Sequence, residues 1–582
     1  MQSSIDVAEG NRRTEIVEGP AGPIEVKIAG EGRAVVLIPS VGRGADDFDA
    51  VIIGAGAAGL YALHRVRGLG LSAKVYEKGD GVGGTWYWNR YPGARCDVES
   101  WDYCYTFSEE LEQEWEWTER FPTQPELERY FNHVADRFDL RRDIEFNTRV
   151  DQARFDDDQN RWLISTSNDE TVSARFLISA AGCLSEVNTP RFDGAETFAG
   201  RQIHTARWPK GGIDVTGMRV GVIGTGSTAV QTIPQLAKQA EHLFVFQRTP
   251  QFAIPARNRP IDADQLEELK HNYRERWELK RANPVGMGRR PPEVSSALEV
   301  DETTRTRIME ESWALGGPGF ARTFDDVMTN AESNQLTSQF VRDKIREKVA
   351  DPAVAESLLA IDHPLGARRL IVEIDYFETY NRPNVTLVDV AASPITEITP
   401  QGLRTAEGSY DLDLIVYATG FDGMTGALLA MDIRGVGGLP LQAKWADGAG
   451  AYLGLVASGF PNFFMITGPG SPAVFSNVIF SIEQHVDWIA NCLAHMLDHD
   501  LDRIDADPEA EAQWTQQVHD IAAQSIVGKT DSWWTGSNIE GKPQGVTFYL
   551  DGTHTYREIC EEIAANGYEG FIFSESTSPA RT

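Results

Sequence analysis

The feature that most constrains the fold is a pair of glycine-rich turns, each standing between a strand-like apolar run and a helical pattern. The first lies in FDAVIIGAGAAGLYALHRVRGLGLSAKVYEKG, from Phe48, and the second in RVGVIGTGSTAVQTIPQLAKQAEHLFVFQRTP, from Arg219. Strand, tight turn, helix and strand make up the βαβ unit that binds a dinucleotide. Two such units predict an α/β protein with two Rossmann-like dinucleotide-binding domains.

The first turn contains three glycines with separate tasks. Gly54 permits the tight turn, Gly56 lets backbone N–H groups approach a pyrophosphate at the helix N-terminus, and Gly59 lets helix and strand pack closely. Glu77 ends the next strand, where its carboxylate accepts hydrogen bonds from ribose hydroxyls and repels a 2′-phosphate. The turn predicts a site for FAD or NAD, with a purely structural glycine turn as the alternative.

The second turn differs at the residue that selects the nucleotide. It comprises Gly224, Thr225, Gly226 and Ser227, and Ala229 takes the third glycine position, which needs only a small side chain. Arg248 and Thr249 follow the next strand, where an acidic residue would favour NADH. A guanidinium can pair with a 2′-phosphate through two bonds. This site is therefore predicted to bind NADPH, the alternative being a solvated cation at a strand end.

Composition removes several classes of function. The 582 residues have a formal net charge of -32, which disfavours binding to nucleic acid or anionic lipid, and contain no apolar run near the ~18 residues of a membrane span. The five cysteines form no CxxC, so we expect no metal site, no disulfide framework and a reducing cytoplasmic location. A flavoenzyme reduced by NADPH but lacking a redox CxxC is left with oxygen as its acceptor.

The expected organisation has four parts. They are a leader of unknown role at 1–46, the first part of an FAD-binding domain at 47–171, an NADPH-binding domain at 172–418 with a helical insertion at about 257–364, and the second part of the FAD-binding domain at 419–582. Strands are expected at 162–165, 174–180, 385–388 and 412–418, and a long helix at 478–496. Helical stripes are formed by Leu266, Leu269, Tyr273 and Trp277, and by Leu336, Phe340, Val341, Ile345 and Val349.

The leader contains one short apolar run, VVLIP at residues 35–39. It resembles the opening strand of an α/β-hydrolase, but the chain has no GxSxG nucleophile elbow to complete that interpretation. One strand cannot bury a core, so we expect the leader to be an inert appendage.

A resemblance narrows the function. The residues Phe198, Gly200, His204, Thr205, Trp208 and Pro209 match the FxGxxxHTxxWP fingerprint of type I Baeyer–Villiger monooxygenases, directly before the second glycine-rich turn as in that family. Further matches lie at 83–100, 418–422, 468–472 and 532–543. The chain is most similar to the phenylacetone and steroid monooxygenase branch, from about residue 48 to 573.

The resemblance implies a reaction and a catalytic pair. In the family, NADPH reduces FAD, the flavin forms a 4a-peroxide with O2, and the peroxide adds to a ketone that rearranges to an ester or lactone. Arg369, in GARRL, matches the arginine that stabilises the anions of this reaction, and Asp97 matches the carboxylate that positions it. Without the family match, Arg369 could equally pair with Glu373 in a structural role.

The resemblance assigns further residues. Gly84, Thr85, Trp86 and Tyr103 correspond to FAD-binding positions together with Asp97, Arg368 would assist Arg248 at the 2′-phosphate, and Trp533 and Asn538 lie in a mobile lid. His204 corresponds to a histidine that links domain movement to cofactor binding, so we reject it as a general base. Cys183 and the stretch 471–476 depart from the closest relatives. Substrate scope is therefore the least transferable property.

Two other functions stay open at this point. The same flavin chemistry can oxidise sulfides or amines, and a chain of this kind can also be a non-catalytic FAD- and NADPH-binding protein. The expected small molecules are a ketone and O2, and the expected oligomeric state is a monomer or a weak homodimer. The natural ketone is not predicted.

Overall fold

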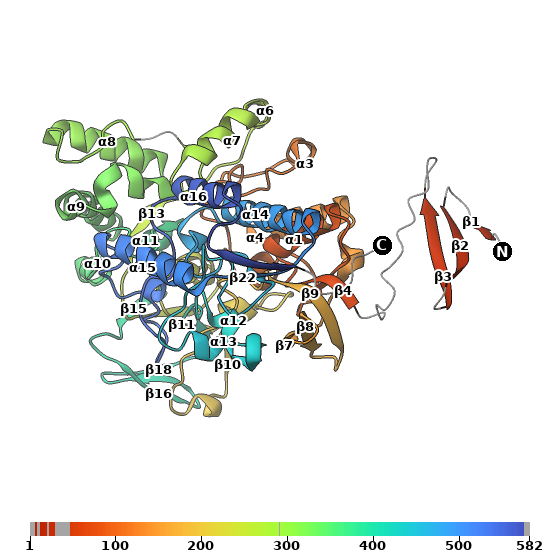
Figure 1. Cartoon of the computed structure of the whole chain (residues 1–582). Coiled ribbons are helices and arrows are strands. Elements are labelled where there is room, and N and C mark those ends of the chain that lie inside the picture. Colours follow the sequence, from red (N-terminus) through yellow and green to blue (C-terminus); the bar gives the residue numbers. More distant parts are fainter. Residues whose placement is uncertain (1–5, 9–11, 20–21, 30–46, 290–291, 576–582) are drawn as a thin grey trace.

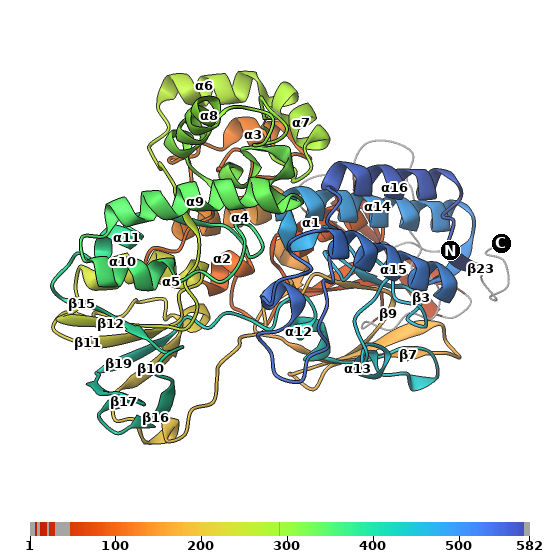
Figure 2. The ribbon, with the colours of Figure 1, turned by 90° about the vertical axis from the view of Figure 1, so that its left-hand side faces the viewer.

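The computed structural model describes residues 6–8, 12–19, 22–29, 47–289 and 292–575. Its body contains two sheets built around parallel strands, one for each glycine-rich turn, with helices packed over them (Figures 1 and 2). The chain is therefore an α/β protein with two Rossmann-like cores, as the two βαβ patterns predict.

The first sheet has eight strands in the order β20-β7-β8-β9-β4-β5-β6, with β21 paired to β9. Their bounds are β4 Asp47–Ile53, β5 Ala73–Tyr76, β6 Ile144–Glu145, β7 Val150–Asp156, β8 Arg161–Thr166, β9 Thr171–Ser179, β20 Asp432–Arg434 and β21 Phe463–Met465. Strand β4 lies between β5 and β9 with both pairings parallel, and its apolar residues are buried. Because β20 and β21 follow the strands of the second sheet in the sequence, the first sheet is built from two separate parts of the chain.

The second sheet has five parallel strands in the order β10-β19-β11-β12-β15. Their bounds are β10 Arg201–His204, β11 Arg219–Ile223, β12 His242–Gln247, β15 Val385–Asp389 and β19 Leu414–Tyr417. The expected strands at 162–165, 174–180, 385–388 and 412–418 are confirmed as β8, β9, β15 and β19 within two or three residues at each end.

Smaller sheets complete the strand pairing. They are β13 Ala253–Pro255 with β14 Ile371–Glu373, β16 Ile395–Thr399 with β17 Gly402–Thr405 and β18 Ser409–Asp411, and β22 Leu501–Ala506 with β23 Phe571–Glu575. The parallel pairing of β13 with β14 brings the chain on either side of the helical region together.

Helices cover both sheets. Around the first sheet lie α1 Ala57–Gly68, α2 Thr85–Trp88, α3 Glu109–Glu114, α4 Gln124–Arg137, α12 Gly426–Leu429, α13 Leu441–Lys444, α14 Val478–Asp498, α15 Pro508–Gln524 and α16 Thr553–Ala565. The long apolar helix expected at 478–496 is confirmed as α14, which packs on α1 and buries its apolar face in the main core. Among the described residues, no helix has both the length and the apolar character that a membrane crossing requires.

A helical region separates β13 from β14. It contains α6 Ala263–His271, α7 Tyr273–Ala282, α8 Glu302–Leu315, α9 Ala331–Lys348 and α10 Pro352–Leu359, and α5 Ser227–Ala237 and α11 Tyr376–Thr379 lie nearby on the second sheet. The first expected stripe is divided between two helices, because the helix breaks at Asn272. The second lies on α9, where Val341 and Ile345 are fully buried. We call residues 263–359 the helical region; its limits as an insertion stay a prediction.

The leader differs from the expectation of a single strand. Its described residues form a three-stranded antiparallel sheet of β1 Asp6–Ala8, β2 Arg12–Gly19 and β3 Gly22–Ala29, paired with no other sheet (Figure 1). β3 alternates apolar and polar residues from Ile24 to Ile28, and β2 contains only the apolar pair Ile16 and Val17, so neither strand has the continuous apolar run that would have predicted it. The run at 35–39 lies outside the described residues.

Candidate functional site

The first glycine-rich turn connects β4 to α1 and leaves no room for side chains. Gly54 has a φ of +100°, and a Cβ there would lie 2.7 Å from the carbonyl oxygen of Ala180. A Cβ on Gly59 would lie 1.8 Å from the carbonyl oxygen of Gly54, because the helix begins directly against the strand. No side chain caps the start of α1 at Gly56. The first-turn N–H groups are thus free to bind a pyrophosphate.

Glu77 lies beside this turn at the end of β5. Its side chain is buried, and its two oxygens accept hydrogen bonds from the backbone N–H groups of Ala55 and Gly79, both at 2.8 Å. A carboxylate has about four acceptor positions, so two bonds leave capacity for a ribose hydroxyl. The residues of the turn and Glu77 therefore fit the adenosine end of an FAD molecule.

The next segment closes over the same turn. Gly84 has a φ of +54°, and a Cβ there would lie 2.8 Å from the Cα of Gly56. Trp86 Nε1 donates to the hydroxyl oxygen of Tyr103 at 3.1 Å, and both rings are largely buried. Thr85 is exposed at the first position of α2.

The second turn connects β11 to α5 and is more open. Gly224 has a φ of +111° and packs against Ala418, whereas a Cβ on Gly226 would meet nothing within 4 Å. Ala229, at the third glycine position, is fully buried. The hydroxyl of Thr225 donates to the carbonyl oxygen of Thr249 at 2.8 Å. This bond ties the turn to the end of β12, next to Arg248.

Two guanidinium groups lie at the far end of this turn. Arg248 is exposed, and Arg368 donates from Nε and Nη2 to the carbonyl oxygen of Asp531, at 3.1 and 2.8 Å. Burial lowers the pKa of Arg368, Asp362 offsets part of that, and the charge of Arg248 lowers it further. Two cations that repel each other in this way form a favourable site for a phosphate dianion.

Arg369 and Asp97 form a bidentate ion pair. Nε and Nη2 of Arg369 donate to the two carboxylate oxygens of Asp97, each at 2.7 Å, and Nη1 donates to the carbonyl oxygen of Val474 at 3.0 Å. Burial lowers the pKa of Arg369, but the charge and the hydrogen bonds of Asp97, together with Cys96 and Tyr103, raise it by more, so the pKa is raised overall. Glu373 instead pairs with Lys348 at 2.6 Å, so the alternative that joins it to Arg369 is wrong.

The fingerprint residues lie apart from this centre. Phe198, Gly200, His204, Thr205, Trp208 and Pro209 lie in and around β10, and none of them lines the cavity described below. The ring of His204 is buried, and its Nδ1 accepts a hydrogen bond from the N–H of Ala206 at 3.1 Å. Burial lowers the pKa of His204 to about 4. The ring is therefore neutral near pH 7 and does not line the cavity; its rejection as a general base stays a prediction.

The segment expected to form a lid is attached to the chain after β19. Asn538 Nδ2 donates to the carbonyl oxygen of Phe421 at 2.9 Å, and Lys542 pairs with Asp422. The ring of Trp533 lies against Gly423. Side chain and backbone of this segment thus cover the space between the two glycine-rich turns.

A single cavity of about 1530 Å³ joins these groups. The predicted site residues on its wall are Gly54, Gly56, Glu77, Gly84, Thr85, Trp86, Asp97, Tyr103, Gly224, Thr225, Gly226, Ser227, Arg248, Thr249, Arg368, Arg369 and Trp533. Gly59 is not on the wall, since it packs between α1 and β4. Among the described residues, no three His, Cys, Asp or Glu side chains are grouped as a metal site would require. All five cysteines lie in the described part and are free.

Two members of the site carry no signal in the sequence. Gln231 lies on α5, the helix of the second glycine-rich turn, and binds the segment that contains Tyr91 and Arg95. Its Nε2 donates to the carbonyl oxygen of Arg95 at 3.0 Å, and its Oε1 accepts from the hydroxyl of Tyr91 at 2.8 Å. The backbone carbonyl of Val474 accepts a hydrogen bond from Nη1 of Arg369, the guanidinium nitrogen that does not bind Asp97. An interior glutamine of a helix and a backbone carbonyl carry no motif, so neither could be found without the fold.

Comparison with known proteins agrees with this geometry. The pattern of the pyridine nucleotide-disulphide oxidoreductase family matches residues 51–333. A Baeyer–Villiger monooxygenase of Pseudooceanicola batsensis is 42% identical over 534 residues, which cover 90% of this chain and 96% of the relative. The phenazine N-monooxygenase PhzNO1 of Lysobacter antibioticus is 42% identical over 536 residues, covering 91% and 98%. Oxidised steroid monooxygenase bound to NADP superposes with a TM-score of 0.87 at 50% identity, covering 91% of this chain and 100% of that one.

Proposed function

The chain belongs to the Baeyer–Villiger monooxygenase family, and from that premise we propose that Arg369 is its catalytic cation and Asp97 the carboxylate that orients it. The enzyme uses FAD and NADPH and converts ketones to esters or lactones with O2. Reduced FAD, when bound, supplies the activation of oxygen. The single observation that carries the proposal is the bidentate pair of Arg369 with Asp97 on the wall of the shared cavity.

Arg369 stabilises negative charge on oxygen. Attack of an oxygen nucleophile on a ketone carbonyl creates an anionic adduct, and a fixed cation that needs no reorganisation lowers the barrier to it. A guanidinium keeps its charge at all working pH values and offers donors in a fixed plane. With one edge held by Asp97 and the Val474 carbonyl, the side chain remains 29% exposed towards the cavity.

Asp97 offsets the cost of keeping that cation in the site. Taking a guanidinium out of water costs several kcal/mol unless a well-oriented partner compensates for it. Two parallel hydrogen bonds also fix the plane of the guanidinium, so the charge cannot rotate away from the reacting oxygen. Asp97 therefore acts by orienting Arg369.

The NADPH side is formed by the second turn and its cations. The open space at Gly226 lets a pyrophosphate approach the start of α5, and Arg248 with Arg368 pairs with the 2′-phosphate. Arg368 also holds the carbonyl of Asp531, so the phosphate site touches the start of the lid. The lid residues Trp533 and Asn538 keep water from the cavity.

A heteroatom oxygenation is the second candidate activity. It is favoured by the phenazine N-monooxygenase relative, whose identity to this chain equals that of the Baeyer–Villiger relative named above. Parallel product analysis with ketones, sulfides and N-heteroaromatic compounds separates the two. The cytoplasmic location and the monomeric or weakly dimeric state remain proposals based on the sequence.

The test is the variant Arg369→Ala. Hydride transfer from NADPH to FAD needs stacked rings and no added cation, so anaerobic flavin reduction should keep at least about half its rate. Ester formation should fall by a factor of about 100 or more, the usual effect of removing one charge-stabilising donor, with the NADPH consumed appearing as H2O2. Stopped-flow absorbance and product analysis measure the two steps.

Arg307→Ala is the matched control, because this arginine pairs only with exposed carboxylates of the helical region. It should leave ester formation unchanged. Substantial ester from Arg369→Ala would overturn the assignment of the catalytic cation. Absence of NADPH oxidation by the wild-type protein in the presence of FAD and ketones would instead favour a non-catalytic protein.

A further inference from the structure

Two buried carboxylates follow Asp97 in the chain and take no part in the proposed chemistry. The side chains of Glu99 and Asp102 are 4% and 1% exposed. They lie on one turn, because the N–H of Asp102 donates to the carbonyl oxygen of Glu99 at 2.9 Å. A chain segment that buries two acidic side chains so close to a catalytic carboxylate needs a source of compensating charge.

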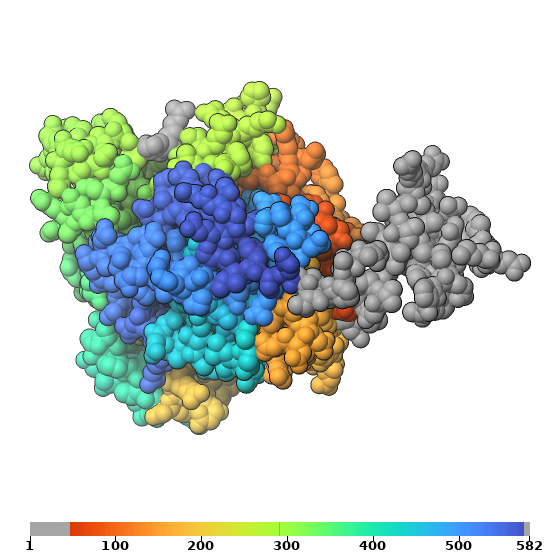
Figure 3. Space-filling model, in the orientation of Figure 1, coloured from red at the N-terminus to blue at the C-terminus, as the bar shows by residue number. Residues whose placement is uncertain are grey.

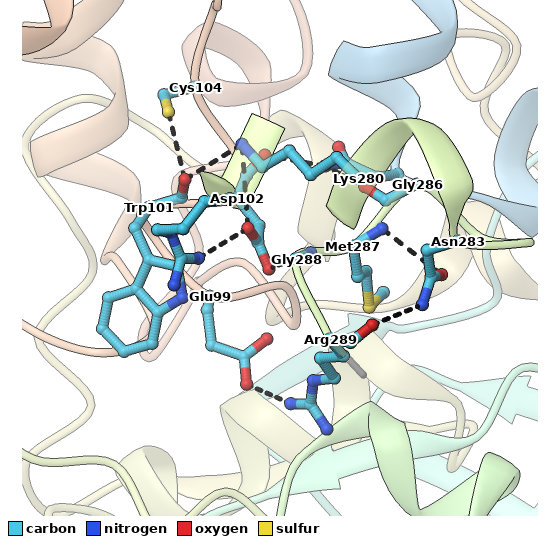
Figure 4. A network of polar contacts seen from close by, with 12 residues as sticks. Glu99, Trp101, Asp102, Cys104, Lys280, Asn283, Gly286, Met287, Gly288 and Arg289 are labelled. Carbon is cyan, nitrogen blue, oxygen red and sulfur yellow. Dashed lines mark hydrogen bonds and ion pairs between the residues drawn. The ribbon is translucent and has the colours of Figure 1, made fainter. Parts of the chain in front are cut away.

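Each carboxylate faces two cations. Glu99 pairs with Arg120 at 2.8 Å and with Arg289. Asp102 pairs with Arg276 at 2.8 Å and lies 3.7 Å from the ammonium of Lys280. Figure 4 shows Arg289 reaching Glu99 and Lys280 reaching Asp102 from the green helical region.

Three of the four cations belong to the helical region. Arg276 and Lys280 lie on α7, and Arg289 lies in the turn that follows it. The backbone of that turn adds to the contact, since the N–H of Gly288 donates to Asp102 at 3.2 Å. The helical region therefore binds the segment that contains Asp97 through ion pairs and a backbone hydrogen bond.

These ion pairs hold the two segments rigidly because both carboxylates are buried. Lys280 is 3% exposed, and Arg120 donates to the carbonyl oxygens of Leu315 and Gly316 as well as to Glu99. Moving one member would leave a buried charge without its partner, which is strongly unfavourable. Such a network is poorly suited to adding stability but well suited to fixing one arrangement.

The same helical region also holds the chain next to Arg369. Asn334, on α9, donates from Nδ2 to the carbonyl oxygen of Leu365 at 2.8 Å and accepts from its N–H at 3.2 Å. On the other side, Lys348 pairs with Glu373. The segments that carry the two members of the catalytic pair are thus attached to one body.

From these contacts we propose that the helical region is a frame that sets the relative position of Asp97 and Arg369, with Arg289 as a positioning residue that acts through Glu99. This rests on the proposed role of the Arg369–Asp97 pair. Arg289 touches neither member of the pair, so its effect reaches the chemistry only through the segment of residues 94–102. A displacement of about 1 Å in a catalytic group can cost about 100-fold in rate.

The experiment compares Arg289→Ala with the control Arg307→Ala in the holoenzyme. Both arginines belong to the helical region, but Arg289 pairs with the buried Glu99, whereas Arg307 pairs with exposed carboxylates. In Arg289→Ala, amide hydrogen exchange in peptides covering residues 94–102 should be at least about tenfold faster than in wild type. The share of NADPH recovered as ester should fall about tenfold, with anaerobic flavin reduction and the KM for NADPH unchanged. Arg307→Ala should match wild type in all four measurements.

A double variant separates positioning from general damage. In an Asp97→Ala background, Arg289→Ala should reduce the ester share no further, because two changes that act through one group are not additive. Unchanged exchange in residues 94–102, or a full tenfold further loss in the Asp97→Ala background, would overturn the inference. Either result leaves the proposed function standing as long as the wild-type enzyme forms ester and Arg369→Ala does not.

Gly319→Ala offers a second route to the same answer if Arg289→Ala does not fold. A Cβ on Gly319 would lie 1.6 Å from Nη1 of Arg289, so the substitution displaces the guanidinium and removes no charge. The expected results are those of Arg289→Ala in weaker form. Normal exchange and a normal ester share in Gly319→Ala, with the folded state verified by bound FAD, would also contradict the proposal.

Discussion

The position of Arg369 is determined from two directions. Asp97 takes two of its donors and the Val474 carbonyl takes a third, so the guanidinium has a fixed plane and an open face on the cavity. Burial lowers the pKa of Arg369, but the charge and hydrogen bonds of Asp97 and the neighbouring Cys96 and Tyr103 together more than compensate, so the pKa is raised. At the scale of single residues, the site is a permanent cation whose orientation is imposed by neighbours.

Arg248→Ala should reduce the preference for NADPH over NADH. The loss of one charge-assisted contact to a phosphate costs about 1.5–3 kcal/mol, or roughly ten- to hundredfold in affinity for NADPH. Affinity for NADH should not change, because it lacks the 2′-phosphate. Titration of both nucleotides measures this, with the exposed Arg382→Ala as the control. An unchanged preference would refute the assignment of Arg248 to the 2′-phosphate.

His204→Gln should make the protein less sensitive to acid. The pKa of His204 is lowered from 6.5 to about 4, so the unfolded chain binds more protons than the folded one between these values. The stabilising contribution is present above pH 6.5 and is lost as the pH falls to about 4, by up to about 1.4 kcal/mol per pH unit. Urea unfolding at several pH values across this window should show a shallower loss in the variant. An equal slope in both proteins would rule out His204 as a source of the acid sensitivity.

At the scale of elements, the two glycine-rich turns are not equivalent. Gly59 is enclosed by the backbone of Gly54, whereas Gly226 borders open space on the cavity side. The first turn thus uses its third glycine to pack α1 on β4. The second turn uses Ala229 there and keeps Gly226 clear for a ligand.

The pair Gly59→Ala and Gly226→Ala tests this difference. A Cβ 1.8 Å from the Gly54 carbonyl oxygen forces α1 away from β4, so Gly59→Ala should lose bound FAD and several kcal/mol of stability. Gly226→Ala should fold with full FAD content, yet bind NADPH about tenfold more weakly, since the methyl group occupies the approach to the helix N-terminus. FAD content, thermal midpoint and NADPH titration are the measurements. Full FAD content in Gly59→Ala would contradict the packing argument.

At the scale of the whole molecule, the first sheet is assembled from both ends of the body. Strand β21 pairs with β9, so the C-terminal part returns across the second sheet to complete the first. Figure 3 shows the blue C-terminal surface beside the green helical surface and the orange N-terminal part. Both glycine-rich turns therefore line one cavity, and the helical region packs against segments that carry its wall residues Asp97 and Arg369.

Deleting residues 1–46 should leave activity and thermal midpoint nearly unchanged. The sheet of β1, β2 and β3 pairs with no strand of the body, which begins at β4. The deletion variant should keep its FAD, and its melting curve should match that of the full-length protein within a few degrees. A large loss of folded protein would show that the leader contributes to the core.

The sequence by itself determined the elements that depend on local pattern. Strand-like runs predicted β8, β9, β15 and β19, and a long apolar stretch predicted the helix α14, because buried strands and helices need apolar residues along their length. The spacing of Gly54, Gly56 and Gly59 fixed a nucleotide turn, and the fingerprint of residues 198–209 indicated the family. The prediction from local patterns was wrong at Asn272, where the expected stripe is divided between two helices. It also missed the leader strands β2 and β3, which contain few consecutive apolar residues.

Only the tertiary structure decided which distant residues meet. Along the chain Arg369 had Glu373 within reach, and no local pattern pointed to Asp97; only the family resemblance did, and in the structure Asp97 is the partner of Arg369. Gln231, the Val474 carbonyl and the cations around Glu99 and Asp102 carry no motif and acquire a role only when separate elements pack together. The physical reason is that a local pattern records how a segment buries its own face, whereas the pairing of charges in a low-dielectric interior depends on the final positions of several segments at once.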